Sequence, residues 1–113
     1  MPGTDTFTLE SAGLKSDIAL MLNRLYETYI VKGIPVVMGE FGAMEKNGNL
    51  QSRVSWLSFY VAQARSRGVT CCWWDNNIFS CSGERFGLFD RTSAACVYPE
   101  LLEAFMRYSV PQP

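Results

Sequence analysis

The sequence predicts an α/β fold with parallel strands. Helical and strand-like segments alternate in the order helix, strand, helix, strand, loop, helix. The two strand-like segments are preceded by similar residues, Lys32-Gly33-Ile34 and Arg67-Gly68-Val69, which lie 35 positions apart. Hydrophobic residues make up 48% of the 113 residues, enough to bury a core. Alternation at this spacing is typical of parallel strands joined by right-handed helical crossovers.

The first helix is expected after an irregular lead-in over residues 1–15. Either Ser16 or Asp17 can cap its first turn, and Gly33 is expected to end it. Its apolar stripe recurs at helical spacing and consists of Ile18, Met21, Leu22, Leu25 and Tyr29.

The first strand is expected over residues 34–38, a continuous apolar run short enough for a strand that is buried on both faces. Pro35 lies at its start, where a missing N–H is tolerated. Residues 39–42 end the strand, and residues 46–49 form a turn. The next helix carries an apolar face and is closed by Gly68; that face consists of Val54, Leu57, Val61 and Ala64.

The second strand is expected over residues 69–74, and residues 75–77 lead from it into a long loop. Pro99 can start the final helix, on which Leu101, Phe105 and Tyr108 share one face. A complete (β/α)₈ barrel needs about 250 residues, so this chain can hold only part of one. Two parallel strands leave both sheet edges unpaired. We therefore expect a homo-oligomer, or a chain packed beside the rest of a barrel.

Composition and charge exclude several classes of function. The net charge is −1 and the charges are interspersed, so neither nucleic acid nor an anionic membrane is expected as a partner. No apolar run approaches the roughly 18 residues of a membrane span, and residues 1–5 do not resemble a signal peptide. The absence of histidine excludes Ser-His-Asp and Cys-His catalysis and most zinc sites. We expect no metal and no cofactor.

The four cysteines contain no Cys-x-x-Cys pair, which argues against a metal knuckle. Cys81 and Cys96 both lie in loop-like sequence, so theirs is the most plausible of the possible disulfides. Cys71 and Cys72 lie in an apolar run and are expected to be buried free thiols.

Glu40 directly follows an apolar strand, the position at which barrel enzymes carry catalytic groups. Its carboxylate could attack an anomeric carbon, or it could cap or salt-bridge a loop. Trp73 and Trp74 must point to opposite sides of the second strand, so one of them can offer its ring to a sugar. The seven Phe, five Tyr and three Trp suit an uncharged, flat ligand, or simply a core.

Asp75, Asn76 and Asn77 supply donors and acceptors beside the exposed tryptophan. They could contact a substrate, or they could serve the turn, where Asn and Asp are favoured. Asp75 could also be a second catalytic carboxylate, but nothing in the sequence favours that role.

Residues 34–42, which contain Gly39-Glu40-Phe41-Gly42, resemble strand seven of the glycoside hydrolase family 5 endoglucanases. Residues 72–77 resemble strand eight of that family, and residues 86–91 and 98–100 are similar to its closing loop and last helix. The resemblance covers nearly the whole chain. It implies the C-terminal part of a (β/α)₈ TIM barrel, comprising strands 7 and 8 with flanking helices and incomplete on its own.

The resemblance also implies roles for individual residues. In that family the glutamate of Gly-Glu-Phe-Gly is the nucleophile, which corresponds to Glu40, and a tryptophan at the position of Trp74 lines the −1 subsite. The implied reaction is retaining endo-hydrolysis of β-1,4-glucan, with xyloglucan, mixed-linkage glucan, xylan or mannan as other possible substrates. The parent enzyme is expected to be secreted, with its signal outside this chain.

The chain departs from the family in two important ways. The family's acid/base is a glutamate that follows an asparagine at strand four, and this chain contains no Asn-Glu dipeptide. The family's active-site histidines are also absent. A retaining glycosidase needs two carboxyl groups, so we expect the chain alone to be weak or inactive. The alternatives are a non-catalytic carbohydrate-binding fragment and a structural fragment that completes a barrel with another chain.

Overall fold

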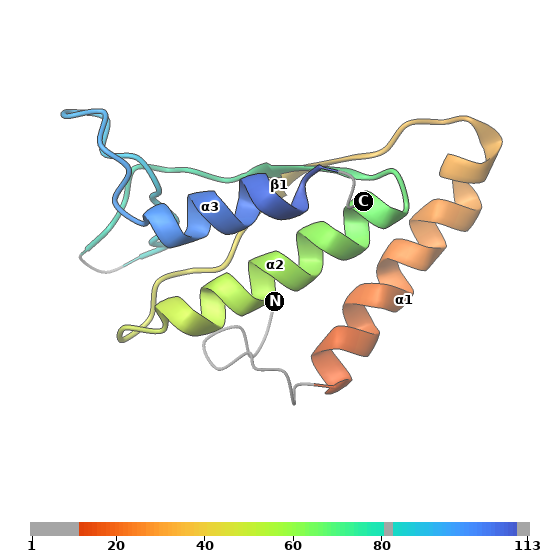
Figure 1. Cartoon of the computed structure of the whole chain (residues 1–113), viewed down its shortest axis with the longest axis horizontal. Helices are drawn as coiled ribbons and strands as arrows, with labels where there is room; N and C mark the ends of the chain where they lie inside the picture. Colours follow the sequence, from red (N-terminus) through yellow and green to blue (C-terminus); the bar gives the residue numbers. More distant parts are fainter. Residues whose placement is uncertain (1–11, 81–82, 111–113) are drawn as a thin grey trace.

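The structure, a computed structural model, describes residues 12–80 and 83–110. Within these residues, helices and strands follow the expected order (Figure 1). The elements are α1 (Ala12–Thr28), the 3-10 helix η2 (Ile30–Lys32), β1 (Val37–Phe41), α2 (Leu50–Ser66), β2 (Thr70–Trp73) and α3 (Pro99–Tyr108).

β1 and β2 pair in parallel, as the sequence predicted. Val37 faces Thr70, Met38 faces Cys71, and Phe41 faces Trp73. From Met38 to Phe41 the first strand advances three residues while the second advances two, so β1 contains a bulge. A bulge of one residue exchanges the faces of the side chains that follow it.

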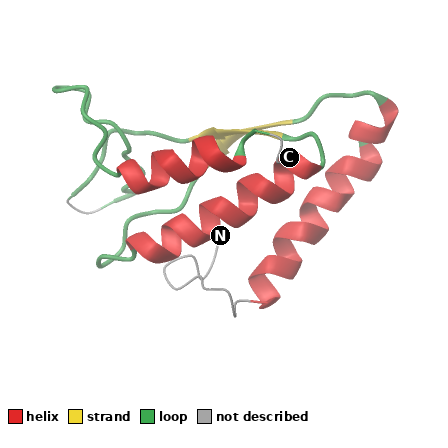
Figure 2. Cartoon of the chain, in the orientation of Figure 1, coloured by secondary structure: helices red, strands yellow, loops and turns green. Residues whose placement is uncertain are grey.

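The core lies between the sheet and the helices. α2 and α3 lie side by side on one side of the strands, and α1 lies alongside α2 (Figures 1 and 2). At its centre the Phe41 ring stacks on Trp56 at 5.4 Å and meets Tyr60 at 4.9 Å. Aromatic rings bury large apolar areas. This cluster therefore fixes the end of β1 against α2.

The other face of the sheet is open in the described part of the chain. Val37 is 58% exposed, and Thr70 and Cys72 are also exposed. The expectation of a strand buried on both faces is therefore wrong for this chain, because helices cover only one side. The strand is also displaced from residues 34–38 to residues 37–41, and Ile34 is 49% exposed before it.

The first helix begins earlier than predicted. It starts at Ala12, so Ser16 and Asp17 lie inside it rather than at its cap. Leu14 packs against the core, which indicates that tertiary contact extends the helix beyond the local capping signal. Tyr29 lies beyond its end and is exposed. The first helix ends at Thr28, so Gly33 does not end it as predicted. Gly33 instead follows η2 with φ of +79°, a conformation that favours glycine.

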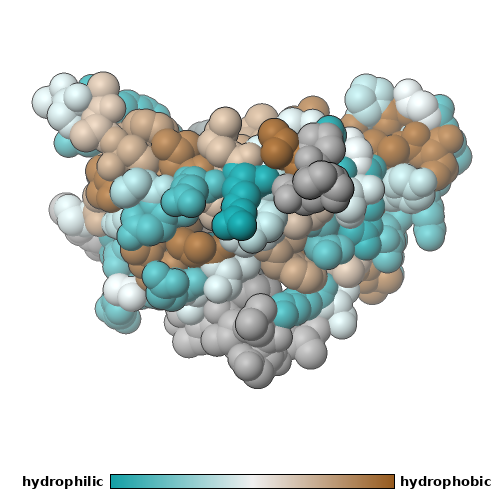
Figure 3. Space-filling view, viewed as in Figure 1, coloured by the Kyte–Doolittle hydropathy of each residue, from teal (hydrophilic) through white to brown (hydrophobic). Residues whose placement is uncertain are grey.

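Three further boundary predictions hold, but the second strand is shorter than expected and covers residues 70–73 instead of 69–74. The turn at Asn47 and Gly48 has positive φ at both residues, Gly68 closes α2 with φ of +78°, and Pro99 opens α3. Figure 3 shows hydrophilic and hydrophobic residues mixed over the helical side of the molecule. Among the described residues, every helix is too short or too polar to cross a bilayer.

The cysteines differ from expectation. Cys72 is exposed and Cys71 is half-buried, since neighbouring strand residues point to opposite faces and only one face is covered. The prediction that both are buried is therefore wrong for Cys72. Cys96 is recorded as a free thiol, which does not support its pairing with Cys81; Cys81 itself lies outside the described residues.

Candidate active site

Glu40 lies inside β1, one residue before its end, and not after the strand as predicted. Met38 packs against the core and Phe41 is buried in it. Strict alternation would place Met38 and Glu40 on the same face. The bulge adds one residue between Met38 and Phe41, so Phe41 returns to the core while Glu40 is exposed.

Trp73 and Trp74 separate as the sequence predicted. Trp73 meets the Phe41 ring edge-on at 5.6 Å, and its indole N–H donates to the Phe86 carbonyl at 2.9 Å. Trp74 is 43% exposed, and its backbone N–H donates to the Phe41 carbonyl at 2.8 Å. The hydrogen bond from Trp74 to Phe41 joins the carboxyl ends of the strands, so the exposed indole lies next to the strand end that carries Glu40.

Glu40 and Trp74 line the same open pocket, whose volume is about 330 Å³. Aromatic side chains form much of its wall, and a second carboxylate, that of Glu84, also lines it. The lining residues are Glu40, Phe41, Gly42, Trp56, Tyr60, Trp74, Glu84 and Phe86. Apolar walls with a few polar groups are typical of small-ligand sites.

Asp75 organises the loop that follows β2. Its Oδ1 accepts hydrogen bonds from the backbone N–H groups of Asn77 and Leu88, at 3.1 and 3.0 Å, and its Oδ2 accepts one from Phe89 at 3.0 Å. Arg91 donates to the Asp75 carbonyl at 2.7 Å. Both carboxylate oxygens are therefore used within the loop.

Asn76 and Asn77 act in a similar way. The Asn76 Oδ1 accepts from Ile78 and Phe86, both at 3.2 Å, while Asn77 Oδ1 accepts from the Arg91 backbone at 3.1 Å. Asn77 has φ of +60°, which Asn tolerates better than most residues. These contacts favour the turn role for Asp75, Asn76 and Asn77; their contact with a substrate stays a prediction.

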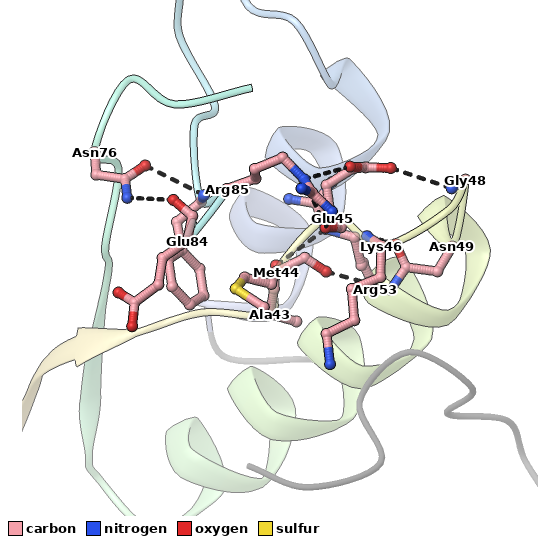
Figure 4. A network of polar contacts seen from close by, with 11 residues as sticks. Ala43, Met44, Glu45, Lys46, Gly48, Asn49, Arg53, Asn76, Glu84 and Arg85 are labelled. Carbon is pink, nitrogen blue, oxygen red and sulfur yellow. Dashed lines mark hydrogen bonds and ion pairs between the residues drawn. The ribbon is translucent and has the colours of Figure 1, made fainter. Parts of the chain in front are cut away.

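The loop after β1 is tied to the loop after β2 through Glu45 and Arg85 (Figure 4). Arg85 Nε lies 2.8 Å from Glu45 Oε2, and the Glu45 backbone N–H donates to the Arg85 carbonyl at 3.0 Å. The Gly48 backbone N–H donates to Glu45 Oε1 at 3.1 Å. This bond and the Arg85 guanidinium lower the pKa of Glu45 below its ordinary value.

Arg53 is fully buried beneath these loops. Its Nε donates to the Ala43 carbonyl at 3.0 Å, and its guanidinium lies 4.7 Å from the centre of the Tyr98 ring. Its two terminal nitrogens have no hydrogen-bond partner among the described residues. Burial lowers the pKa of Arg53 from its usual value. Arg53 therefore connects the backbone of Ala43, three positions after Glu40, to Tyr98, which directly precedes α3.

Sequence reasoning missed Glu84 as a residue of the pocket. It lies in a loop without periodicity, and no motif relates it to Glu40, which is 44 positions earlier. The only feature of the sequence that could have indicated Glu84 is that it is a carboxylate in the loop that follows β2 and Trp74. In the described part of the chain, no three His, Cys, Asp or Glu residues are arranged to hold a metal ion.

The chain is similar to known cellulases and endoglucanases. The family model of cellulases, glycosyl hydrolase family 5, matches residues 3–80. Endoglucanase B of Neocallimastix patriciarum is 42% identical over 92 residues, which cover 81% of this chain and 19% of that protein. Endoglucanase 1 of Ruminococcus albus is 38% identical over 111 residues, which cover 98% of this chain and 26% of that protein.

Solved structures agree in fold. A GH5 lichenase from Caldicellulosiruptor sp. F32 superposes with a TM-score of 0.89 at 52% identity, over 92% of this chain and 28% of that one. Its E188Q mutant was solved in complex with cellotetraose. A GH5-4 broad-specificity endoglucanase from Clostridum cellulovorans gives a TM-score of 0.86 at 38% identity, over 97% of this chain and 32% of that one. The chain thus spans about a fifth to a third of these relatives.

Proposed function

The chain belongs to glycosyl hydrolase family 5, the cellulase family, and from this premise we propose that it is the nucleophile-bearing part of a retaining endo-β-1,4-glucanase. Its described residues form a two-stranded α/β piece of the family's (β/α)₈ barrel, not a closed barrel. The observation that carries the proposal is the shared pocket of Glu40 and Trp74 at the carboxyl ends of the strands, the end at which barrel enzymes place their active sites.

Glu40 is the proposed nucleophile. Its carboxylate oxygen forms a bond to the anomeric carbon as the bond from that carbon to the leaving glycosidic oxygen breaks, which gives a covalent glycosyl-enzyme. Water then attacks the anomeric carbon from the opposite face and releases Glu40 as a carboxylate. Two inversions at the same carbon give net retention.

The first step also needs a proton for the leaving oxygen, and the second step needs a base for the water. In retaining enzymes one carboxyl group does both, at about 5–5.5 Å from the nucleophile. We propose that a glutamate outside this chain supplies it. Asp75 is a poor substitute, because backbone N–H groups already occupy both of its carboxylate oxygens.

Trp74 is the proposed platform for a sugar ring. The indole is 43% exposed and lies in the pocket with Glu40, and an indole face packs well against the apolar face of a pyranose. The relative that was solved with cellotetraose supports a β-glucan as the substrate. No cofactor takes part in the proposed reaction.

The open face of the sheet supports a further partner for the chain. Val37, Thr70 and Cys72 are exposed on strands that, among residues 12–80 and 83–110, carry helices on one side only. Parallel sheets are normally covered on both sides. We propose that this face packs against the rest of a barrel, or against further copies of the chain.

The parent enzyme is proposed to be secreted, because a polymeric β-glucan must be cut where the polymer lies. Detection of the parent protein in the culture medium of its source, rather than in the cell pellet, would test this.

The nucleophile can be tested without the missing acid. A 2-deoxy-2-fluoro-β-cellobioside with a dinitrophenolate leaving group needs no proton for departure, and the fluorine slows release of the glycosyl-enzyme. We expect intact-mass spectrometry of the 113-residue chain to show a cellobiosyl adduct that maps to Glu40. The Glu40→Gln variant should show no adduct, and Glu27→Gln, which changes an exposed carboxylate on α1, should react normally.

An adduct on another residue, or none in a folded chain that binds the sugar, would contradict Glu40 as nucleophile. The second of these results would support a non-catalytic carbohydrate-binding fragment, which the exposed Trp74 favours as the alternative. A chain that neither binds nor reacts until the rest of a barrel is added would support a structural fragment.

A further inference from the structure

We propose that Glu84 is a second sugar-binding carboxylate of the pocket, one that accepts hydrogen bonds from sugar hydroxyl groups and selects neutral glucans over acidic ones. The inference rests on the proposed function, since it assumes that the Trp74 platform holds a sugar. Glu84 lies in the loop between β2 and α3, and it lines the same pocket as Glu40 and Trp74.

The backbone of Glu84 is held from two sides. Its carbonyl accepts a hydrogen bond from Asn76 Nδ2 at 2.8 Å, and the Phe86 N–H donates to Asn76 Oδ1 at 3.2 Å. The next residue, Arg85, is bound to Glu45 from the loop after β1. The backbone of Glu84 is thus held in place beside the pocket before a ligand binds, so binding has to order the side chain but not the loop, which lowers its entropic cost.

The carboxylate itself takes no part in this bracing. Figure 4 shows it pointing away from Asn76 and Arg85, on the side of β1. Glu84 is exposed, and its carboxylate forms no hydrogen bond or ion pair with another described residue. The neighbouring cation, Arg85, is directed to Glu45 instead. Glu84 therefore keeps both oxygens available for a ligand.

A carboxylate at this place favours one class of ligand. Ionised carboxylates only accept hydrogen bonds, and hydroxyl groups of a pyranose are donors that can satisfy both oxygens. Such charge-assisted bonds are the stronger kind. Glu40 and Glu84 together make the pocket negative, so a sugar that carries its own carboxylate is repelled. The pocket should thus prefer glucose units to glucuronic acid units.

The test compares two tetrasaccharides, cellotetraose and its counterpart oxidised to carboxylates at every C6. Their affinities for the 113-residue chain are measured by calorimetric or NMR titration. Glu84→Ala should weaken cellotetraose binding about 10- to 100-fold, as expected for loss of hydrogen bonds to a charged group. Glu84→Gln should weaken it less, because the amide oxygen still accepts, and should bind the acidic tetrasaccharide more tightly than the unchanged chain does.

Two controls separate this inference from the proposed function. Glu27→Gln should leave both affinities unchanged, and far-UV circular dichroism should show each variant folded. In one outcome, Trp74→Ala weakens cellotetraose binding while Glu84→Ala and Glu84→Gln bind like the unchanged chain. In that case Glu84 does not bind the sugar, and the proposed role of Trp74 as a sugar platform is retained. If the unchanged chain fails to bind, or Trp74→Ala has no effect, the sugar site and the role of Glu84 are both overturned.

Discussion

Cys71 and Cys72 are adjacent in β2 but meet different surroundings. Cys71 faces the core, where burial, with a smaller contribution from Cys72, raises its pKa to about 12. Cys72 faces the open side of the sheet and is exposed. The thiolate is the reactive form of cysteine, so the direction of the side chain decides the chemistry of each thiol.

Brief treatment with iodoacetamide at pH 8 should therefore modify Cys72 well before Cys71. A thiol with a pKa near 12 is ionised in only about one molecule in ten thousand at this pH. Fragmentation mass spectrometry of the peptide that contains both residues reads out the order. In Cys72→Ser, Cys71 should stay unmodified over the same time, and equal labelling of Cys71 and Cys72 in the unchanged chain would refute the assignment of faces.

Arg53 combines a buried charge with several neutral contacts. Its aliphatic stem fills core volume, its Nε holds the Ala43 carbonyl, and its guanidinium stacks on Tyr98. Two of its nitrogens lack partners among the described residues. A buried charge without full pairing costs stability, so replacing it with an apolar side chain of similar length can be nearly neutral.

Two substitutions separate the packing of Arg53 from its charge. Arg53→Ala should lower the free energy of unfolding by about 2–4 kcal/mol, since it leaves a cavity and an unpaired Ala43 carbonyl. Arg53→Met keeps most of the volume and should cost about 1 kcal/mol, the value of the lost hydrogen bond. Urea denaturation measures both. Equal destabilisation by the two changes would show that the charge, not the volume, is what the core requires.

At the scale of elements, the two loops that follow β1 and β2 act as one unit. Glu45 belongs to the first loop and Arg85 to the second. They are joined by a salt bridge, by one hydrogen bond between their backbones, and by bonds from the Arg85 guanidinium to the Glu45 carbonyl (Figure 4). Trp73 ties the second loop back to β2 through its bond to the Phe86 carbonyl. The pocket wall at Glu84 is thus fixed relative to the strand that carries Glu40.

The contribution of Glu45 should depend on pH. The pKa of Glu45 is lower in the folded chain than its ordinary value of 4.5, first through the Gly48 N–H and then through Arg85. A carboxyl group of this kind stabilises the fold above its unfolded pKa, and this contribution disappears as the pH falls through the folded pKa. Because the group is partly exposed, its contribution is at most about 1 kcal/mol.

We expect Glu45→Gln to have a lower free energy of unfolding than the unchanged chain at pH 7. This difference in stability should disappear as the pH is lowered below about 4.5. Denaturation curves at several pH values provide the measurement. Glu27→Gln, a change on the exposed surface of α1, should show no such difference. A difference for Glu45→Gln that persists unchanged at pH 3 would show that the carboxylate charge is not responsible.

At the scale of the whole molecule, the described residues leave one face of the sheet covered and the other open. The covered face holds the aromatic cluster around Phe41. The open face exposes Val37, Thr70 and Cys72, and the pocket with Glu40 lies at the carboxyl end of the same strands. A parallel sheet with an uncovered face and unpaired edges tends to associate.

Sedimentation velocity at micromolar concentration should therefore show association of the isolated chain. Val37→Lys, on the open face, should shift the distribution toward the monomer, because a charge there opposes burial. Met106→Lys is the matched control: Met106 is 59% exposed, much as Val37 is at 58%, but lies on α3. A monomer in the unchanged chain, or equal effects of both changes, would contradict association through this face.

Much of the fold was predictable because it depends on local pattern. The apolar stripe with Ile18 and Leu22 and the residues with special backbone angles, such as Gly68, act through their own neighbours. The start of α1 was not predictable, since contact of Leu14 with the core, rather than a cap, extends it. That one of Trp73 and Trp74 would be exposed was also predictable, because alternation along a strand is a local property. Only the family resemblance pointed to Trp74.

The sequence by itself determined the order of elements, the parallel pairing, and the candidacy of Glu40 and Trp74, since periodicity and short motifs carry that information. Only the tertiary structure decided how Glu40 reaches the exposed side, because the bulge arises from how β1 pairs with β2. It also decided that Asp75 supports the loop while Glu84 lines the pocket. Those roles depend on hydrogen bonds between residues far apart in the chain, which no local pattern records.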